Sequence, residues 1–546
     1  MFNHQKYRPF AFNPQLKDRT WPDKLITQAP DWVSVDLRDG NQALIDPMTV
    51  EQKLRFFQLL VEIGFKEIEI GFPSASQIEF DFTRQLIEGG LIPDDVTIQV
   101  LVQAREHLIA RTFEALCGAK RAIVHVYNST SRVQREKVYE KSQAEITEIA
   151  LQGASLLKEY AAKYPKTEWI FEYSPESFSQ TEPDFAVSIC EAVCRVWEPE
   201  KGQGVILNLP STVECSTPNL YADQIEYFCR HLPSRPHVRI SVHTHNDRGC
   251  AIAASELAVL AGADRVEGTL LGNGERTGNM DIMVMAMNLY SQGIDPKLDF
   301  SKMNEMVHIV SECNNLPVHP RHPYVGELVF TAFSGSHQDA IKKSLEKESN
   351  GIWDIAYLPI DPVDIGRSYQ DVVRINSQSG KGGVAYILAR DYGLNVPRWL
   401  QIDFAQKVQK QSETTQKELA SAEILKLFEA SYMQESALSL ESYSITRGSN
   451  EDALSCRIIH QGQTHTLTGN GSGVLSAFID ALSHYSQRRL NITNYAEHAM
   501  TGATDAQAVA YVQMLVDDKL TTGIAYSQDT VSAMLRATLT ALAQAY

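Results

Sequence analysis

The stretch WVSVDLRDGNQALIDPMTVEQKLRFFQLLVEIGFKEIEIGF (residues 32–72) contains one complete strand–helix–strand pattern. Its two ends, WVSVDLR (32–38) and EIEIGF (67–72), are short apolar runs typical of strands. Between them lies VEQKLRFFQLLVEIG (50–64), in which apolar residues recur at helical spacing. Near-continuous apolar strands separated by a helix are typical of a parallel sheet that is buried on both faces. We therefore predict an α/β fold for this part of the chain.

The same pattern continues to about residue 271. Six further apolar runs predict strands at TIQVLV (97–102), AIVHVY (122–127), WIFEYS (169–174), GVILNLP (204–210), RISVHTH (239–245) and RVEGTLLG (265–272). Helical patterns such as NLYADQIEYFCRHL (219–232) lie between them. Eight strand–helix units in roughly 240 residues match the length of a closed (β/α)8 TIM barrel.

Polar residues gather where the predicted strands end, and the starts of the strands show no such clustering. The ends carry Arg38-Asp39, Pro73-Ser74, Gln103, Asn128-Ser129, Glu172 to Glu176, Asn208 with Thr212, His243 to Asp247, and Asn273 to Arg276. In a TIM barrel the chemistry sits at the carboxyl ends of the strands. A doubly wound open sheet is the alternative fold, and it leaves this ring of polar ends unexplained.

Composition excludes several classes of protein. The net charge of −17 argues against a nucleic-acid partner, which would require clustered Lys and Arg. The N-terminus lacks the apolar segment of a secretory signal, and nowhere do 18 apolar residues run together, so no membrane association is expected. The eight cysteines include no CxxC pair, a usage typical of reduced thiols. We expect a cytoplasmic protein.

The rest of the chain predicts further domains. We expect an N-terminal arm (1–30), the barrel (31–290), helical linker subdomains (291–425) and an α+β domain (426–546). The last domain contains an internal duplication, interpreted as two β-β-α repeats ending in the helices VLSAFIDALSHY and TVSAMLRATLTALAQAY. Because it offers few acid, base or nucleophilic groups, a binding or regulatory role is favoured over catalysis.

One set of residues predicts a metal site. His243 and His245 are two apart in a predicted strand, so both imidazoles point to the same face. Asp39 follows the first strand, which neighbours the eighth strand and lies next but one to the seventh in a closed barrel. Two imidazoles and a carboxylate bind one face of a metal ion and leave positions open for substrate. Asn279 is either a fourth ligand or the N-cap of the next helix.

Seven motifs, in chain order, resemble those of the alpha-isopropylmalate synthase family, which also includes homocitrate and citramalate synthases. They are DLRDGNQALIDPM (36–48), FEYSPESF (171–178), NLPSTVE (208–214), HTHNDRG (243–249), GNGERTGN (272–279), SGSHQDA (334–340) and YLPIDPVDIGRSYQ with RINSQSGKGG (357–383). The resemblance runs nearly end to end. The arm containing KYRPF and the YLPIDP segment resemble the larger form of this enzyme family.

The resemblance implies a reaction. Acetyl-CoA, 3-methyl-2-oxobutanoate and water would give 2-isopropylmalate and CoA in the first committed step of leucine biosynthesis. It implies metal ligands at Asp39, His243, His245 and Asn279. Mg²⁺ is the expected ion, with Mn²⁺ or Zn²⁺ as alternatives and K⁺ as an additional activator. It also implies a homodimer.

The resemblance also implies roles for five other residues. Arg38 matches an arginine close to the oxo group, Thr212 a residue that binds the carboxylate of the oxo acid, and Glu176 an acid/base position. His337 and Tyr369 match residues that the partner protomer brings to the barrel mouth. Either Glu176 or His337 could deprotonate the acetyl methyl group. The simpler alternatives are ion pairing for Arg38, helix capping for Glu176 and His337, and packing for Tyr369.

The last domain resembles the family's leucine-binding regulatory module, with L-leucine as the expected feedback inhibitor. Gly469, Gly471, Gly473 and Gly523 would let the backbone approach a small ligand, or would serve only tight turns. GNGSG stands here where the family more often has a GNGP-like turn, so loss of leucine inhibition is the alternative.

Three other functions compete with this one. A sister synthase, such as homocitrate or citramalate synthase, would differ only in the shape of its pocket. A lyase of the HMG-CoA type would not need the duplicated C-terminal domain. A non-catalytic metabolite sensor on the same barrel is disfavoured by the intact set of Arg38, Asp39, His243 and His245.

Overall fold

The computed structural model describes residues 3–347, 351–368, 381–415, 419–433, 438–449, 451–500 and 507–546. The chain divides into two compact units. The first comprises Met1–Val329 with Pro362–Arg367, and the second comprises Phe330–Asp361 with Ser368–Tyr546. This division is coarser than the four segments predicted from the sequence.

The first unit contains a closed barrel of eight parallel strands that pair in chain order, with the eighth pairing with the first. The strands are β1 (Asp31–Ser34), β2 (Glu67–Gly71), β3 (Thr97–Gln103), β4 (Arg121–Ser129), β5 (Glu168–Glu176), β6 (Gly204–Ser211), β7 (Arg239–Thr244) and β8 (Arg265–Gly268). The predicted TIM barrel and all eight predicted strands are confirmed.

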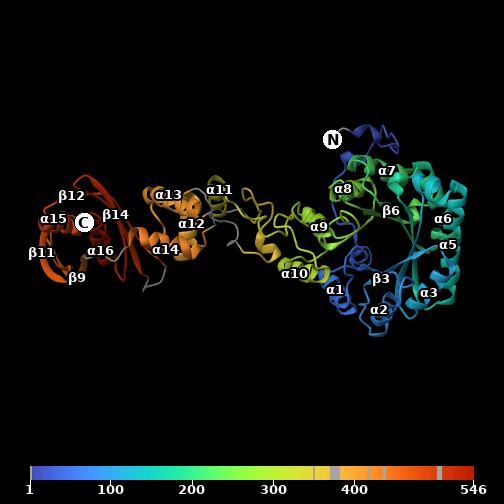
Figure 1. Ribbon diagram of the computed structural model, residues 1–546, viewed down its shortest axis with the longest axis horizontal. Helices are drawn as coiled ribbons and strands as arrows, with labels where there is room; N and C mark the ends of the chain where they lie inside the picture. Colours follow the sequence, from blue (N-terminus) through green and yellow to red (C-terminus); the bar gives the residue numbers. More distant parts are fainter. Residues whose placement is uncertain are drawn as a thin grey trace. The chain divides into compact units, whose positions relative to one another are not determined.

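Helices surround the barrel on its outside (Figure 1). They are α1 (Val50–Ile63), α2 (Gln77–Glu88), α3 (Glu106–Leu116), α4 (Arg132–Gln134), α5 (Gln143–Lys163), α6 (Pro183–Trp197), α7 (Pro218–His231), α8 (Ala251–Ala261), α9 (Ile282–Tyr290) and α10 (Met303–Asn314).

Helix α1 illustrates how the sequence sets these boundaries. Thr49 and Gln52 form a reciprocal capping box at its start, and Gly64 ends it with a left-handed φ of 111°. Phe56 and Leu60 lie on its buried face. The apolar residues whose helical spacing predicted α1 are therefore the ones that it buries.

Strands β1 and β8 are shorter than predicted, and the difference shapes the site. After Ser34 the chain enters a π-helical turn, Asp36–Gly40, instead of continuing as a strand to residue 38. The Asp36 carboxylate accepts hydrogen bonds from the Ser34 hydroxyl and from the backbone N–H of Leu270, which follows β8. These bonds tie the two strand ends together and hold the turn that carries Arg38 and Asp39.

The barrel interior is polar, which the sequence analysis did not predict. Arg265 is fully buried, and it pairs with Glu67 at 2.6 Å and with Glu267 at 2.9 Å. Its guanidinium also donates hydrogen bonds to Gln99 and Ser241. A buried cation of this kind is tolerated because carboxylates and hydrogen-bond acceptors surround it.

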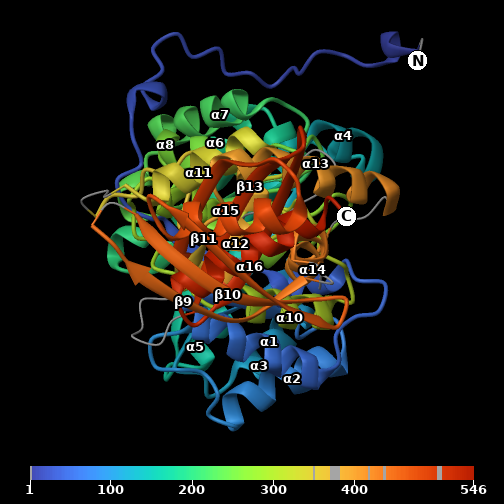
Figure 2. The same cartoon turned by 90° about the vertical axis from the view of Figure 1, so that its left-hand side faces the viewer.

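The N-terminal arm, drawn in dark blue in Figure 2, contains little regular structure. Its residues 19–21 dock on helix α7. Arg19 donates two hydrogen bonds of 2.7 Å to the Asp223 carboxylate, and the Trp21 indole donates to the same carboxylate at 2.9 Å. Glu226, one helical turn further on, accepts from the backbone N–H and hydroxyl of Thr20.

The second unit begins with helices and ends with an α+β module. The helices of the first part are α11 (Gly335–Leu345), α12 (Lys381–Tyr392), α13 (Arg398–Thr415) and α14 (Ser421–Tyr432). The module comprises β9 (Leu438–Arg447), β10 (Asp452–His460), β11 (Gln463–Gly471), α15 (Val474–Ser486), β12 (Leu490–Ala499), β13 (Ala508–Val516), β14 (Lys519–Ser527) and α16 (Thr530–Ala543).

The predicted duplication is present, but each repeat is β-β-β-α instead of β-β-α. Each second strand predicted from the sequence is a hairpin of two antiparallel strands, β10 with β11 and β13 with β14. Two consecutive residues of positive φ turn the chain in each case, Gln461-Gly462 and Asp517-Asp518. Such turns match the twist of a tight hairpin. The two sheets have the orders β11-β10-β9 and β12-β13-β14.

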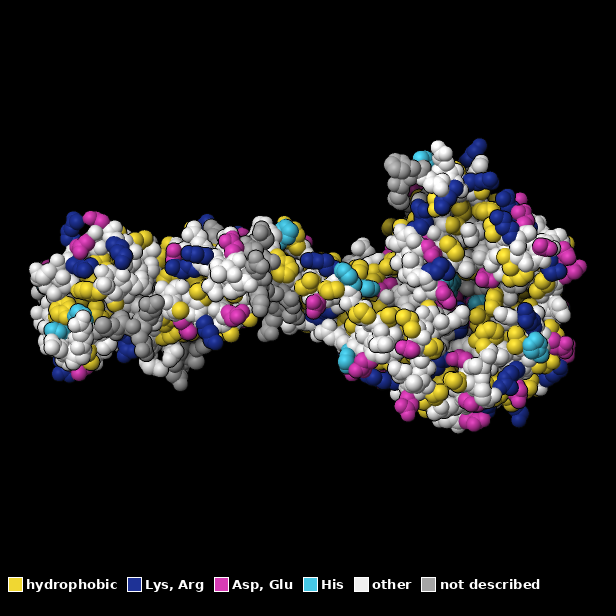
Figure 3. Space-filling view, viewed as in Figure 1, with side chains coloured by type: hydrophobic (Ala, Val, Ile, Leu, Met, Phe, Trp, Pro, Cys, Tyr) yellow, Lys and Arg dark blue, Asp and Glu magenta, His cyan; other side chains and the backbone are white. Residues whose placement is uncertain are grey.

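Among the described residues, no helix is both long enough and apolar enough to cross a membrane. Acidic and basic side chains are interspersed over the visible face of each unit (Figure 3). The net charge of −17 is therefore not concentrated in one visible acidic patch.

Candidate active site

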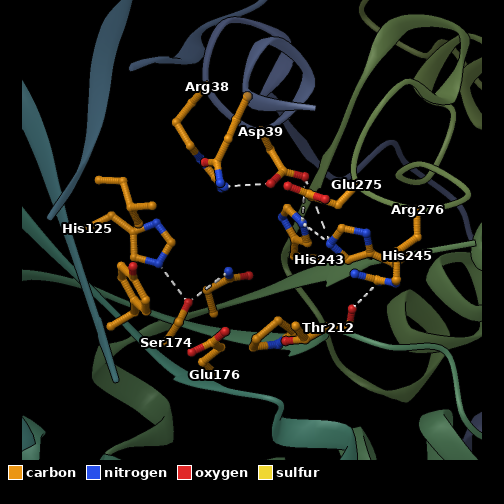
Figure 4. A pocket seen from close by; sticks show the side chains of 15 residues that line it. Arg38, Asp39, His125, Ser174, Glu176, Thr212, His243, His245, Glu275 and Arg276 are labelled. Carbon is orange, nitrogen blue, oxygen red and sulfur yellow. Dashed lines mark hydrogen bonds and ion pairs between the residues drawn. The ribbon is translucent and has the colours of Figure 1, made fainter. Parts of the chain in front are cut away.

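A pocket of about 290 Å³ opens at the carboxyl ends of the barrel strands. Its lining includes six of the residues predicted from the sequence, Arg38, Asp39, Glu176, Thr212, His243 and His245. Figure 4 shows Arg38 and Asp39 across the pocket from Glu176 and Thr212, with the two histidines beside each other. The closed barrel thus brings together side chains that lie far apart in the sequence.

Asp39, His243 and His245 converge on one point and are all buried. The two Nε2 atoms lie 3.3 Å apart, and Asp39 Oδ2 lies 3.8 Å from that of His243 and 3.9 Å from that of His245. Two imidazole nitrogens and a carboxylate at this spacing suit a divalent ion with open positions.

The electrostatics of Asp39 and His245 favour their metal-binding forms. His243 differs, because burial opposes its protonation but Glu267 and Asp39 raise its pKa above the ordinary value. Burial opposes ionisation of Asp39, but the charges of Arg38, His243 and His245 lower its pKa to about 2. Burial and the neighbouring His243 lower the pKa of His245 to about 4. A carboxylate and a neutral imidazole are the forms that bind a cation.

Asn279 adds an amide to the same site. Its Nδ2 donates to Asp39 Oδ2 at 2.6 Å, and its buried Oδ1 has no hydrogen-bond partner among the described residues. The alternative of helix capping is wrong, because Asp281 caps α9 by accepting from the backbone N–H of Val284. A buried amide oxygen without a donor fits a ligand atom, so the donor set of the site fits a metal ion.

Arg38 pairs with carboxylates and also lines the pocket. Its Nε donates to Glu69 Oε2 at 2.5 Å and its Nη1 to Asp39 Oδ1 at 2.8 Å. Burial opposes its charge, but Glu69 and Asp39 raise its pKa further above the ordinary value for arginine. Ion pairing, the simpler role considered for Arg38, is therefore present, and it also holds the guanidinium cation at the pocket wall.

Glu176 and Thr212 belong to adjacent strand ends. The hydroxyl of Ser129 donates to Glu176 Oε2, and Glu176 caps no helix, because Glu182 is the residue that precedes α6. Thr212 Oγ1 accepts from the backbone N–H of Ser177 at 2.9 Å. The Thr212 hydroxyl hydrogen is thereby left free to donate toward the pocket.

His337 and Tyr369 were also predicted as site residues. His337 lies on α11 in the second unit, where its ring stacks on Tyr357 with centroids 3.9 Å apart. It is not the cap of α11, which begins after Ser334. Tyr369 lies outside the described residues. The catalytic roles of both residues stay predictions.

The pocket also contains residues that the sequence analysis did not single out. His125 on β4 bonds to Glu69 Oε1 at 3.2 Å through Nδ1 and to Ser174 Oγ at 2.7 Å through Nε2. Arg276 pairs with Asp247 at 2.7 Å on the opposite side. The sequence could have indicated His125, because it is the polar residue within the apolar run AIVHVY (122–127). In a barrel with other polar side chains inside, such a residue can point into the interior.

Comparison with known proteins identifies the family. Three family models match the chain in order: HMGL-like over residues 29–310, the alpha-isopropylmalate synthase post-catalytic domain over 327–389, and the LeuA allosteric (dimerisation) domain over 418–546. The 2-isopropylmalate synthase of Alcanivorax borkumensis is 54% identical over 99% of this chain and 97% of its own length. That of Azotobacter vinelandii is 52% identical over the same shares. The chain belongs to the 2-isopropylmalate synthase family.

Among solved structures, an HMG-CoA lyase from Bacillus subtilis is 19% identical with a TM-score of 0.44, and the match covers 53% of this chain and 95% of the lyase.

In this member of the 2-isopropylmalate synthase family, three of the four predicted regulatory glycines have a packing role. A Cβ atom at Gly469 would overlap Ala477 O and crowd Ala481 N, both on α15. A Cβ atom at Gly523 would overlap Ala537 O and Ala541 N on α16, the equivalent positions of the second repeat. Gly471 lies equally close to α15. These glycines let β11 and β14 lie directly against the helices.

Gly473 differs from the other three. Its φ of −175° is ordinary extended backbone, and nothing lies within 4 Å of where a Cβ atom would stand. It lines a hollow of about 680 Å³ where the N-terminal ends of α15 and α16 meet strand β12. The part of the chain that matches the LeuA allosteric (dimerisation) domain therefore contains a cavity of its own.

Proposed function

We propose that this protein is a divalent-metal-dependent 2-isopropylmalate synthase, an acyltransferase that condenses acetyl-CoA with 3-methyl-2-oxobutanoate and hydrolyses the thioester. The products are 2-isopropylmalate and CoA. The observation that carries the proposal is the convergence of Asp39, His243 and His245 beside Arg38 at the barrel mouth, in a chain related to these synthases over its full length.

Asp39, His243, His245 and the free amide oxygen of Asn279 would hold the ion. We propose Mg²⁺, with Mn²⁺ or Zn²⁺ as alternatives and K⁺ as an additional activator. When bound, the ion acts as a Lewis acid that polarises the oxo group of the oxo acid.

The chain's own residues bind the oxo acid and stabilise charge. Arg38 presents a fixed cation where negative charge develops on the attacked oxygen, and the carboxylates of Glu69 and Asp39 hold it in place. The free hydroxyl hydrogen of Thr212 can donate to the substrate carboxylate, since Oγ1 already accepts from Ser177. Both interactions would orient the acceptor for attack by the acetyl group.

The acetyl methyl group of acetyl-CoA is a poor acid and needs a positioned base. Glu176 lines the pocket with its carboxylate held by Ser129, so it can take a proton at Oε1 or Oε2. His337 is the other proposed base. Proton transfer by such a group contributes about 10²–10⁴ in rate.

A second proposal concerns L-leucine as feedback inhibitor, bound in the hollow beside Gly473. Its apolar lining includes Leu475, Ile492 and Met534, which suit an aliphatic side chain, and Glu497 offers a carboxylate for the ammonium group. Helix α15 has no side-chain cap at Gly473, so the backbone N–H groups at its start suit the leucine carboxylate.

One assay tests the catalytic proposal. Purified protein is mixed with Mg²⁺ or Mn²⁺, acetyl-CoA and a panel of 2-oxo acids, and release of the CoA thiol is followed. We expect release that depends on 3-methyl-2-oxobutanoate and stops with a chelator. Preference for 2-oxoglutarate or pyruvate would instead assign a homocitrate or citramalate synthase, and no release with any acceptor would favour the sensor.

We also propose that the protein acts as a cytoplasmic homodimer. The match to a dimerisation domain over residues 418–546 supports the dimer. Light scattering coupled to size-exclusion chromatography is expected to give twice the chain mass of 61.0 kDa, and a monomer that is fully active would contradict it.

A further inference from the structure

Glu267, on β8 beneath the pocket, is a fully buried carboxylate that receives four hydrogen bonds. Oε2 accepts from His243 Nδ1 at 2.8 Å and from Asn208 Nδ2 at 3.2 Å. Oε1 accepts from Arg265 Nη1 at 2.9 Å and from Gln99 Nε2 at 3.1 Å. Each oxygen therefore faces two N–H donors, and the carboxylate has a fixed orientation.

This arrangement determines how His243 presents itself to the metal site. Because Glu267 is an acceptor, the hydrogen of the His243 ring belongs on Nδ1. The Nε2 lone pair is then directed toward Asp39 and His245, 3.8 and 3.3 Å away. His245 has no such partner, since its buried Nδ1 makes no hydrogen bond to any described residue. The two imidazoles of the site are thus held differently.

Arg265 in turn holds Glu267 in place. It is fully buried at the barrel centre, and its partners Glu67, Ser241 and Gln99 come from three other strands. Through Arg265 and Glu267, hydrogen bonds therefore connect the barrel interior to His243, a predicted metal ligand at the barrel mouth.

We propose that Glu267 is a positioning residue of the metal centre, which fixes the tautomer and ring orientation of His243 so that Nε2 binds the divalent cation. The proposal rests on the metal site of the proposed function. Carboxylates that accept the second N–H of a metal-binding histidine typically contribute about 10–100-fold to metal affinity.

The test compares two isosteric variants by calorimetric titration of the full chain with Mn²⁺. Glu267→Gln removes the carboxylate next to His243. Glu67→Gln is the matched control, because Glu67 also pairs with Arg265, at 2.6 Å, but makes no hydrogen bond or ion pair with Glu267 or with either histidine of the site among the described residues. We expect Mn²⁺ binding about 10–100-fold weaker in Glu267→Gln and within about twofold of wild type in Glu67→Gln.

Unchanged Mn²⁺ affinity in Glu267→Gln, or an equal loss in both variants, would overturn the proposal. A wild-type protein that binds no Mn²⁺ would overturn the metal site itself, so the two failures are distinguishable. Should Glu267→Gln fail to fold, spectra of ¹⁵N-histidine-labelled, metal-free protein at pH 9 answer the same question. We expect the His243 signal, identified by its absence from His243→Ala, to carry its proton on Nδ1, and a proton on Nε2 would overturn the assignment.

Discussion

The Nε2 atoms of His243 and His245 lie 3.3 Å apart, close enough to share one ion. Asp39 Oδ2 completes a triangle with them, at 3.8 and 3.9 Å. In this geometry a single cation can satisfy all three ligand atoms at once, which no pairwise hydrogen bond among them does.

Replacing His243 by alanine is expected to abolish turnover while the protein stays folded. The substitution removes one of three converging ligand atoms and leaves the hydrogen bonds of the barrel backbone intact. CoA release and circular dichroism check the two parts of this prediction, and Mn²⁺ titration checks that the cause is lost metal binding. His107→Ala, at an exposed position on α3, is the control and should retain activity. Full activity of His243→Ala would remove the metal hypothesis.

Arg38→Lys is expected to lower kcat about 10²–10³-fold, the typical cost of losing one preorganised donor to a developing oxyanion. The guanidinium bonds Glu69 through Nε and Asp39 through Nη1 at the same time. A lysine ammonium is a point charge on a flexible chain and cannot reproduce that fork. Steady-state kinetics with 3-methyl-2-oxobutanoate measure the effect. A kcat within threefold of wild type would mean that Arg38 only supports the fold.

The sequence predicted most of the fold, because strand and helix signals are local. The eight apolar runs and the HxH spacing at the end of β7 needed no knowledge of distant partners. The interior ion pairs could not be predicted, since Arg265 meets Glu67 only when the barrel closes across 198 residues. The third strand of each C-terminal repeat was missed because the turns Gln461-Gly462 and Asp517-Asp518 are so short that each hairpin looks like one continuous strand in the sequence.

Glu67→Gln is expected to lower the free energy of unfolding by about 3 kcal/mol at pH 7, the lower end for removing one partner of a buried ion pair. Burial alone would raise the pKa of Glu67, but Arg265 and Arg239 lower it below its ordinary value. A lowered pKa in the folded state stabilises the protein above the pKa of the unfolded state. That stability is lost as the pH falls through the folded-state pKa.

The difference in free energy of unfolding between wild type and Glu67→Gln should therefore narrow as the pH is lowered below about 4.3, the ordinary pKa of glutamate. Urea unfolding at several pH values measures it. Glu168→Gln is the matched control, because Glu168 also begins a barrel strand but is exposed and lies 4.0 Å from Arg121. A surface pair of this kind contributes little. If the difference in free energy of unfolding widened toward low pH, the lowered pKa of Glu67 in the folded state would be contradicted.

Gly523→Ala is expected to destabilise the C-terminal module by about 1–3 kcal/mol, the usual cost of overpacking. The added methyl group would overlap backbone atoms of Ala537 and Ala541 on α16, and backbone cannot move aside as a flexible side chain can. Thermal unfolding of the full chain measures the loss. An unchanged unfolding midpoint would show that β14 and α16 separate easily.

Gly473→Ala tests ligand binding in the C-terminal module without disturbing its packing, unlike Gly523→Ala. Its extended φ of −175° suits alanine, and the new methyl group would enter open space in the hollow, so folding and basal turnover should be unchanged. If leucine binds in this hollow, the methyl group occupies part of its site, and inhibition should require at least tenfold more leucine. Inhibition of wild type and Gly473→Ala at the same leucine concentration would mean that leucine does not bind in this hollow. Absence of inhibition in the wild type would instead show that the GNGSG turn has lost regulation.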